Sequence, residues 1–304
     1  MSRKPRSLLT RRRLVHLAVF LAGLVALWLL SSFLVAYRLT RRPKPPFAEP
    51  IPAGESWHIE EQRLRTCDGE EIGAWFVQGP DDGPSVVLLH GNGESRRASL
   101  PLAKLLTDER CTVLMLSLRA HGDSSGEHHD IGYSARHDVV AAVEYLERRR
   151  PSRPIIIQGV SLGAAAAIFA APELGARVRA YVLESPYRDL RTAVRNRTAA
   201  YLPPLVDGVA YCGLLCVAPL VLDDVDAVAP INAIGAIPES VPVLLLAGTA
   251  DRLARPDEAR DLYAPVASHG RLVFFEGARH ESLFANDPTR YRETVLSLLR
   301  EATN

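Results

Sequence analysis

Six short apolar runs recur between residues 85 and 275, and patterns typical of helices separate them. A strand that is apolar along its whole length is typical of a sheet covered on both faces. Strands joined through helices run parallel, because the crossover returns the chain to the same edge of the sheet. The sequence therefore predicts an α/β fold with a mostly parallel, twisted sheet between two layers of helices. We expect strands at 85–89, 111–116, 154–157, 180–183, 243–247 and 272–275, and helices at 99–107, 133–150, 161–171, 256–266 and 291–301.

Two further segments depart from this alternation. Residues 58–65 and 71–78 alternate in polarity around Asp68-Gly69, which predicts an antiparallel hairpin. Residues 185–239 lie between two strands that should be neighbours, and an excursion of this length is typical of a small cap over a site. The predicted body is thus a single domain over residues 56–302 with a helical cap at 185–239.

Residues 14–37 contain no Asp, Glu, Lys or Arg. As a helix they would extend about 36 Å, and the hydrocarbon core of a bilayer is about 30 Å thick. No A-x-A pattern follows the apolar run, so we expect an uncleaved signal anchor rather than a cleaved signal peptide. The sequence predicts a basic tail at 1–13, a transmembrane helix at 14–37 and a Pro-rich linker at 38–55. Within that linker, residues 43–54 should form an extended spacer.

Basic residues are concentrated at the amino terminus. Residues 1–46 hold ten of the 36 Lys and Arg side chains and no acid, which leaves the rest of the chain with a net charge of −9. An acidic body argues against nucleic acid as a partner. Six basic residues precede the apolar segment and four follow it, so the positive-inside rule places the amino terminus in the cytoplasm. With only three lysines, a GC-rich bacterial source is expected, and the predicted location is a bacterial inner membrane with the domain in the periplasm.

The four cysteines form no zinc-binding pattern. Their pairing stays open at this point. A Cys212–Cys216 or a Cys67–Cys111 disulfide is compatible with a periplasmic body, and so are free thiols.

The segment Gly159-Val160-Ser161-Leu162-Gly163 directly follows the expected strand at 154–157 and opens an Ala-rich helix. A strand-to-helix turn this tight needs glycine on both sides, and it leaves the serine hydroxyl exposed at the helix start. The sequence therefore predicts Ser161 as a nucleophile. A plain turn with a capping serine is the alternative.

A serine hydroxyl becomes nucleophilic when an imidazole removes its proton and a carboxylate orients that imidazole. Asp251 follows the strand at 243–247, and His280 follows the strand at 272–275. Because the carboxyl ends of parallel strands open on one edge, we expect Ser161, Asp251 and His280 to converge. Glu184 is the second candidate for the acid, and His269 is a poorer base because it precedes its strand.

An acyl intermediate also needs two N–H donors for its oxyanion. Leu162, the residue after the nucleophile, should provide the first backbone N–H. The loop after strand 85–89 should provide the second from Asn92.

Beyond single residues, the chain resembles the α/β-hydrolase superfamily from residue 56 to residue 302. The motifs that carry the resemblance are Leu88-Leu89-His90-Gly91-Asn92-Gly93, Arg119-Ala120-His121-Gly122-Asp123-Ser124, the turn at Ser161, Gly248-Thr249-Ala250-Asp251 and Gly277-Ala278-Arg279-His280. The short cap and the anchor make it similar to membrane-anchored relatives of serine aminopeptidase-like hydrolases and to abhydrolase-domain membrane proteins. The resemblance implies a serine hydrolase that uses neither a metal nor an organic cofactor.

The same resemblance assigns smaller roles and shows departures. It implies that His90 fixes its loop, and it places His121 in a family loop, so we expect no metal site at the nearby cluster of His and Asp residues. Ala120 stands where the family pattern has glycine, and Ser117 stands where many relatives have aspartate. These departures concern the subfamily and not the predicted triad.

The predicted function is hydrolysis of carboxylic ester or thioester substrates, either small acyl esters or lipid-like molecules. Residues 209–222 are apolar but too few to cross a bilayer. We expect them to pack on the hydrolase core and offer an apolar surface to acyl chains, and a lipid-facing lid is the alternative. Peptide hydrolysis, acyl transfer to another acceptor, and a non-catalytic scaffold are the competing functions. The oligomeric state cannot be read from the sequence.

Overall fold

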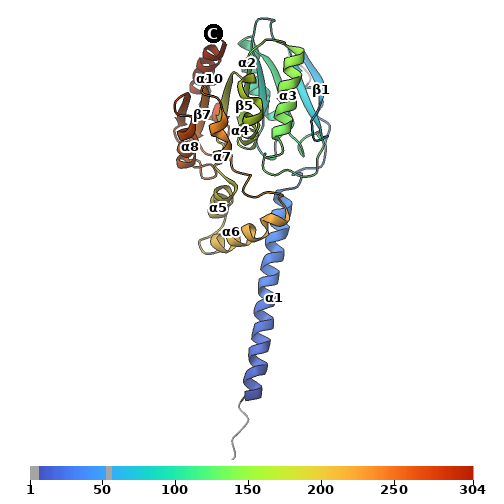
Figure 1. Ribbon diagram of the computed structural model, residues 1–304, viewed down its shortest axis with the longest axis vertical. Coiled ribbons are helices and arrows are strands. Elements are labelled where there is room, and N and C mark those ends of the chain that lie inside the picture. The colour runs from blue at the N-terminus through green and yellow to red at the C-terminus, as the bar shows by residue number, and fades with distance from the viewer. Residues whose placement is uncertain (1–6, 53–56, 304) are drawn as a thin grey trace, which may run out of the picture.

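The computed structural model describes residues 7–52 and 57–303. Residues 1–6 of the predicted basic tail, 53–55 of the predicted linker and residue 56 lie outside the described residues. Helix α1 (Ser7–Leu39) extends away from a layered α/β domain, as Figure 1 shows. The described part of the chain thus has a single long helix at one end and a folded body at the other.

Among the described residues, one sheet of eight strands forms the body, in the order β1-β2-β4-β3-β5-β6-β7-β8. The hairpin of β1 (Ile59–Arg65) and β2 (Glu71–Val77) is antiparallel, and β2 also pairs antiparallel with β4. The strands from β3 onward run parallel to one another. The predicted α/β fold is therefore confirmed. These strands are β3 (Ser85–Leu89), β4 (Thr112–Leu116), β5 (Ile155–Val160), β6 (Ala180–Glu184), β7 (Val243–Gly248) and β8 (Gly270–Phe275).

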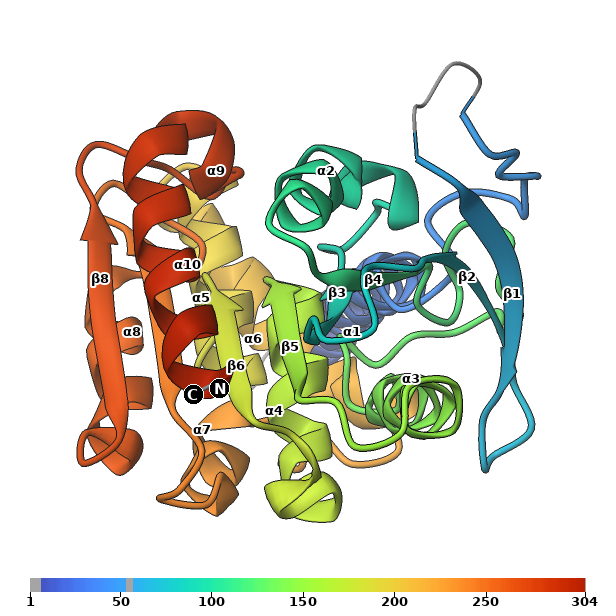
Figure 2. The same cartoon turned by 90° about the horizontal axis from the view of Figure 1, so that it is seen from above.

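Helices cover both faces of the sheet, as the view in Figure 2 shows. Consecutive side chains of a strand point to opposite faces, so Val87 and Leu89 of β3 enter one core while Val86 and Leu88 enter the other. Both faces must be covered because the strands are apolar throughout. Helices α3 (Arg136–Arg149), α4 (Leu162–Leu174) and α8 (Pro256–Tyr263) pack on the first face, and α2 (Leu100–Asp108), α9 (Leu283–Asn286) and α10 (Pro288–Thr303) on the second.

The segment between β6 and β7 contains α5 (Leu190–Tyr201), α6 (Val206–Val217) and the short α7 (Pro230–Ala233). The expectation that the apolar run at 209–222 packs on the hydrolase core is wrong for the part that forms α6, and only its end, at Val221 and Leu222, packs on a cluster that includes Phe169 of α4. Helix α6 lies across α1 and packs mainly against α1 and α5, and it buries only Gly213 and Val217 (Figure 1). The physical reason is that Gly213 permits a close crossing: a Cβ atom there would lie 2.8 Å from Trp28 Nε1. Helix α6 thus packs against the apolar α1.

The linker after α1 is also different from the expected spacer. Residues 43–52 form no helix or strand, but the segment is bound to the domain. Arg42 donates hydrogen bonds to the carbonyls of Gly122 and Gly126. Glu49 is buried, with its carboxylate 3.2 Å from Arg96 Nη1, and it accepts a hydrogen bond from Ser117 Oγ. We call residues 41–52 the docked linker.

Replacing Glu49 with alanine is expected to lower the free energy of unfolding by about 3 kcal/mol, because the buried Arg96 then loses one of its two carboxylate partners. Glu127→Gln is the matched control. The Glu127 side chain is exposed, and its carboxylate lies as far as 3.8 Å from Arg42 Nε. The loss of this weak ion pair should therefore cost less than about 0.5 kcal/mol. Urea unfolding of the detergent-solubilised proteins measures both effects. Equal midpoints for wild type and Glu49→Ala would show that the docked linker does not stabilise the domain.

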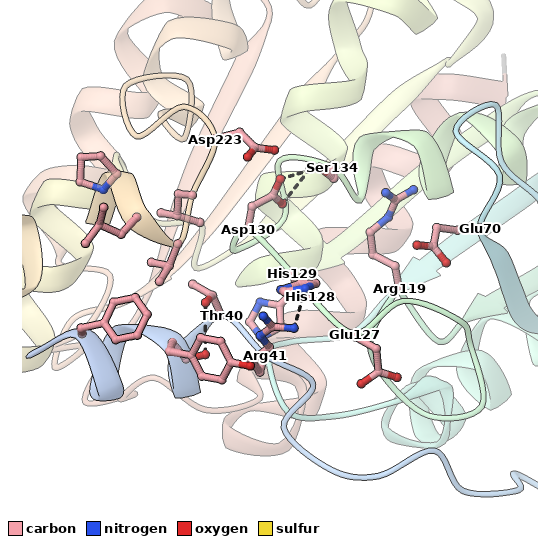
Figure 3. A pocket seen from close by; sticks show the side chains of 16 residues that line it. Thr40, Arg41, Glu70, Arg119, Glu127, His128, His129, Asp130, Ser134 and Asp223 are labelled. Carbon is pink, nitrogen blue, oxygen red and sulfur yellow. Dashed lines mark hydrogen bonds between the residues drawn. The ribbon is translucent and has the colours of Figure 1, made fainter. Parts of the chain in front are cut away.

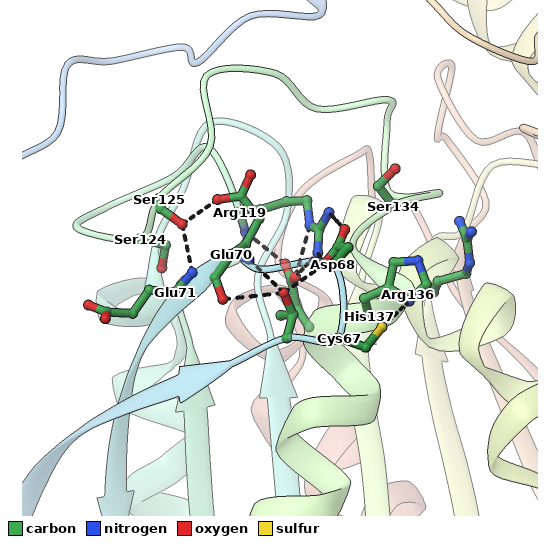
Figure 4. A network of polar contacts seen from close by, with 12 residues as sticks. Cys67, Asp68, Glu70, Glu71, Arg119, Ser124, Ser125, Ser134, Arg136 and His137 are labelled. Atoms are coloured by element: carbon green, nitrogen blue, oxygen red, sulfur yellow. Dashed lines mark hydrogen bonds and ion pairs between the residues drawn. The ribbon is translucent and has the colours of Figure 1, made fainter.

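Arg119 joins the β1–β2 turn to the domain (Figure 4). Its guanidinium lies 2.6 Å from Asp68 Oδ2 and 2.7 Å from Asp138 Oδ1. The hydrogen bond from Arg119 lowers the pKa of Asp68, whereas burial raises the pKa of Asp138 to about 6. The next residue, Ala120, has a φ of +59°, a left-handed conformation that explains why glycine is the family's residue at this position.

The four cysteines are free among the described residues. Cys67 precedes β2, whereas Cys111 lies beside Gly79, which follows β2. The seven residues of β2 span about 20 Å, so a Cys67–Cys111 disulfide is excluded. Cys212 and Cys216 lie one turn apart on α6 with exposed side chains.

Candidate active site

Ser161 occupies a sharp turn between β5 and α4. Its φ of +50° is rare for a residue with a side chain, and such backbone strain is typical of functional turns. A Cβ on Gly159 would lie 2.5 Å from the carbonyl carbon of Gly163, and one on Gly163 would lie 2.5 Å from the carbonyl oxygen of Leu89. Both glycines are therefore required for the chain to turn here, as the motif predicts.

The predicted acid and base reach this turn from two neighbouring strands. Asp251 follows β7 and His280 follows β8. His280 Nε2 lies 3.0 Å from Ser161 Oγ, and His280 Nδ1 lies 2.7 Å from Asp251 Oδ2. The structure thus brings His280 into contact with Ser161, which is 119 positions away in the sequence, and with Asp251, which is 29 positions away. His269 lies at the other end of β8, where its carbonyl accepts a hydrogen bond from Val243, so it is remote from this group as expected.

The environment of Asp251 orients the imidazole. Its second oxygen accepts hydrogen bonds from the backbone of Leu253 (2.7 Å) and Ala254 (2.9 Å), and its side chain is fully buried. A carboxylate held in this way accepts the Nδ1–H of His280 and leaves the Nε2 lone pair directed at the serine hydroxyl. The arrangement can therefore move a proton from Ser161 to His280.

The two predicted oxyanion donors lie beside the serine. Leu162 begins α4, where backbone N–H groups lack helical partners. Asn92 lies in the loop after β3. Neither of the two amides donates a hydrogen bond to another residue in the parts of the chain that the structure describes. Both N–H groups are thus available to a negatively charged oxygen.

His90 holds the Asn92 loop in place, as the resemblance implies. Its Nδ1 donates to the carbonyl of Gly91 and its Nε2 accepts from the backbone N–H of Leu118. Burial lowers the pKa of His90 to about 3, so the ring is neutral and can make both bonds. The Asn92 side chain lies 3.2 Å from His121 Nε2, which ties this loop to the next one.

Glu184, the second candidate for the acid, has a different partner. Its carboxyl accepts hydrogen bonds from the backbone N–H of Leu283 and from the hydroxyl of Tyr291, each at 2.8 Å. It therefore supports the segment that follows His280 and not the imidazole itself. Burial raises the pKa of Glu184 to about 7.

This raised pKa predicts a pH-dependent stability. Glu184 retains its proton in the folded state up to about pH 7 but only up to about pH 4.5 when unfolded. Its contribution is therefore fully present below pH 4.5 and is lost as the pH rises to 7, by about 3 kcal/mol. The side chain of the variant Glu184→Gln does not titrate in this pH range. We expect the difference in unfolding free energy between wild type and Glu184→Gln to change by this amount between pH 4.5 and 7, and parallel curves would contradict the assignment.

A cavity of about 690 Å³ opens above Ser161 and His280. Several of its wall residues were not identified from the sequence. Ser185 follows β6 with a φ of +48°, and its buried Oγ has no hydrogen-bond partner among the described residues. Arg197 and Tyr201 of α5 form another part of the wall. The position of Ser185 directly after a strand, at the same sheet edge as the triad, is the signal that could have revealed it.

A second cavity of about 690 Å³ lies where α1 meets the domain (Figure 3). Arg41, His128 and His129 line it, and Arg41 Nη1 lies 2.5 Å from His128 Nε2. Burial lowers the pKa of His129 to about 3. In residues 7–52 and 57–303 no group of three or more His, Cys, Asp or Glu side chains is placed to hold a metal ion.

Comparison with known proteins agrees with this architecture. Residues 84–211 match the family described as the alpha/beta hydrolase fold. The uncharacterized protein Rv2307c of Mycobacterium tuberculosis is 28% identical over 250 residues, which cover 81% of this chain and 77% of that protein. The uncharacterized membrane protein YNL320W of Saccharomyces cerevisiae is 22% identical, with 84% and 87% covered.

Among solved structures, the esterase Pf2001 of Pyrococcus furiosus superposes with a TM-score of 0.72. It is 21% identical, and the match covers 88% of this chain and all of the esterase. At this level of identity the likeness establishes the fold. The predicted α/β-hydrolase fold is therefore confirmed.

Proposed function

We propose that this α/β-hydrolase-fold chain is a membrane-anchored serine hydrolase that cleaves carboxylic ester or thioester bonds through an acyl-enzyme. The observation that carries the proposal is the continuous hydrogen-bonded series Ser161–His280–Asp251 at the base of a cavity. Similarity in fold to an esterase is a second support. A fold alone hosts many functions, so the argument depends on the site.

The geometry supports a two-step reaction. Ser161 Oγ attacks the carbonyl carbon while His280 Nε2 takes the hydroxyl proton, and the N–H groups of Asn92 and Leu162 bind the resulting oxyanion. The intermediate collapses, the bond to the leaving alcohol or thiol breaks, and His280 returns the proton to that group. Water then attacks the acyl-enzyme with the same proton transfers. The carboxylic acid is released and Ser161 is restored.

Membrane anchoring rests on α1. Over Arg11–Leu39 it is long and apolar enough to cross a bilayer by length and composition, and its most apolar window of 18 residues has a mean hydropathy of 2.4 and few buried residues. The similar yeast protein is named as a membrane protein. The excess of basic residues before the span favours a cytoplasmic amino terminus, with the hydrolase domain on the opposite side of the membrane.

An activity-based probe tests the chemistry. A fluorophosphonate should label the detergent-solubilised wild-type chain, since only an activated serine reacts at a useful rate. Labelling must disappear in His280→Ala, which keeps Ser161 but loses its base. A folded wild-type chain that stays unlabelled would refute the proposed hydrolase.

Substrate comparison tests the reaction class. Ester and thioester substrates of short and medium acyl chains should turn over faster than peptides, because the cavity is lined in part by apolar residues such as Leu102 and Phe284. Faster peptide cleavage would overturn this preference. If added alcohols divert most of the acyl group from water, the enzyme is an acyltransferase and not a hydrolase.

The anchor has its own test. The chain should stay with the membrane fraction after extraction at pH 11 and leave it only with detergent. Release at pH 11 would show that α1 does not span the bilayer.

A further inference from the structure

Helix α6 presents a row of apolar side chains to the outside of the molecule. The row consists of Val206, Val209, Cys212 and Cys216 of α6, together with Leu205 just before the helix and Leu220 just after it. We call these residues the α6 stripe. Leu205 is 87% exposed and Leu220 is 70% exposed. A contiguous row of exposed apolar residues on a folded body marks a surface that contacts something apolar.

Charge is excluded from the stripe. From Gly208 to Leu222 the chain contains no charged residue. Asp207, the acid at the start of α6, turns away from the stripe and lies 3.0 Å from Arg195 Nη1 of α5, with its side chain 14% exposed. The helix therefore has a polar end paired within the protein and a charge-free outer face, so α6 can lie against lipid without burying an unpaired charge.

The place where α6 crosses α1 gives the depth of the stripe. Trp28 Nε1 donates a hydrogen bond to the carbonyl of Val209, and Gly213 lies against Trp28 and Ser32. At 1.5 Å per residue, positions 28 and 32 lie about 21 and 27 Å from Leu14, where the charge-free part of α1 begins. A hydrocarbon core of about 30 Å that starts near Leu14 would thus extend to the level of α6.

We propose that the α6 stripe lies in the bilayer interface on the side of the hydrolase domain, as a second membrane contact beside α1. The inference rests on the proposed membrane span of α1. Its occupant is lipid, because α6 crosses α1 at Trp28, and Leu27 and Leu30 on either side of this position in α1 are exposed. Neither residues 14–37 of α1 nor residues 208–222 contain a charged side chain. The lipid that surrounds α1 can therefore also contact the stripe.

The contact also defines the substrate class of the proposed hydrolase. Arg197 and Tyr201 of α5 line the cavity above Ser161, and Tyr201 is only four residues before Leu205 of the stripe. A helix in the interface therefore brings the cavity wall to the membrane surface. Amphiphilic acyl esters, with a chain in the bilayer and an ester near its surface, are the substrates that this placement favours.

The native cysteines allow a direct test in the full-length chain. The variant Cys67→Ser/Cys216→Ser keeps Cys212 on the stripe, and the control Cys212→Ser/Cys216→Ser keeps Cys67, an exposed cysteine near the β1–β2 turn. Buried Cys111 remains in both. Each variant is labelled with the environment-sensitive fluorophore NBD and reconstituted into phosphatidylcholine–phosphatidylglycerol vesicles. Some vesicles also contain lipid with a nitroxide high on its acyl chain.

We expect the nitroxide lipid to at least halve the emission of the label at Cys212 and to leave the label at Cys67 unchanged. No quenching at Cys212, or equal quenching at both sites, would overturn the proposal. A blue-shifted label at Cys212 without quenching would mean that protein, such as a second copy of the chain, covers the stripe, and this too would overturn it.

The test does not depend on catalysis. Fluorophosphonate labelling of both variants checks the proposed hydrolase separately, so a failed membrane contact and a failed active site give different results. If the reconstituted chain is released from vesicles at pH 11, the anchor itself has failed, and the inference fails with it.

Discussion

Replacing Ser161 with alanine is expected to lower kcat for ester hydrolysis by about a millionfold. The hydroxyl oxygen is the atom that forms the acyl bond, and losses of this size follow removal of the nucleophile from a triad that acts as a unit. The only side-chain hydrogen bond of Ser161 among the described residues is to His280, so the fold should not change. Single-turnover and steady-state assays with a chromogenic ester measure the effect.

The control for Ser161→Ala is its unfolding curve. Alanine has no larger side chain than serine and keeps the same backbone conformation, so the midpoint of unfolding should move little. A variant with wild-type stability and a rate within tenfold of wild type would show that another residue is the nucleophile. Ser185, whose buried hydroxyl faces the same cavity, would be the next to examine.

Asp251→Asn is expected to reduce kcat by about ten-thousandfold while Ser161 and His280 stay in place. An asparagine amide can donate to Nδ1, which then carries no proton, and the imidazole instead presents Nε2–H to the serine hydroxyl. Such a ring cannot take the proton from Ser161 Oγ. The pH–rate profile, recorded with the same ester, should show recovery at high pH where hydroxide can replace the missing base.

Asp257→Asn provides the matched control for this variant. Asp257 lies six positions further along, in the first turn of α8, and its exposed carboxylate pairs with Arg260. Its replacement should change the rate less than twofold. If Asp257→Asn and Asp251→Asn lost activity equally, the loss would reflect general destabilisation of this loop and not the tautomer of His280.

The predicted strands agree closely with the structure because each carries a strong local signal. The run at 85–89 is the observed β3, and the other parallel strands differ from prediction by a few residues at their ends. Strands buried on both faces are continuous apolar runs, and these end abruptly at glycine or a polar residue. The turn at Ser161 was also predictable, since two glycines flank a serine between a strand and a helix.

The contacts of the linker and of α6 could not be predicted in the same way. Glu49 binds Arg96, and α6 binds α1 through a hydrogen bond that joins positions 181 residues apart. Neither the linker nor α6 has a sequence pattern that predicts which part of the chain it contacts. Residues 209–222 are apolar on most sides, so their sequence is compatible with packing on the core, on another helix or in lipid. Only the position of α1 in the folded chain decides between these alternatives.

Cavity walls are harder still to predict. Arg197 and Tyr201 reach the cavity from α5, in a segment whose path depends on how the cap folds back to the domain. Their spacing carries no catalytic motif. By contrast, the predicted site residues all come shortly after the end of a strand, and the order of the strands alone brings them to one edge of the sheet. They are Asn92, Leu162, Asp251 and His280.

The docked linker has a mechanical consequence. Arg42 binds the carbonyls of Gly122 and Gly126, and the adjacent His121 contacts Asn92, which lines the same cavity as Ser161. A rigid stem therefore replaces the flexible tether that a Pro-rich segment would otherwise provide, and its base adjoins the loop that completes the site. The height of Ser161 above the end of α1 is then a fixed dimension of the molecule. Such a chain works at one distance from its point of attachment, and only molecules that present their scissile bond at that distance come within its reach.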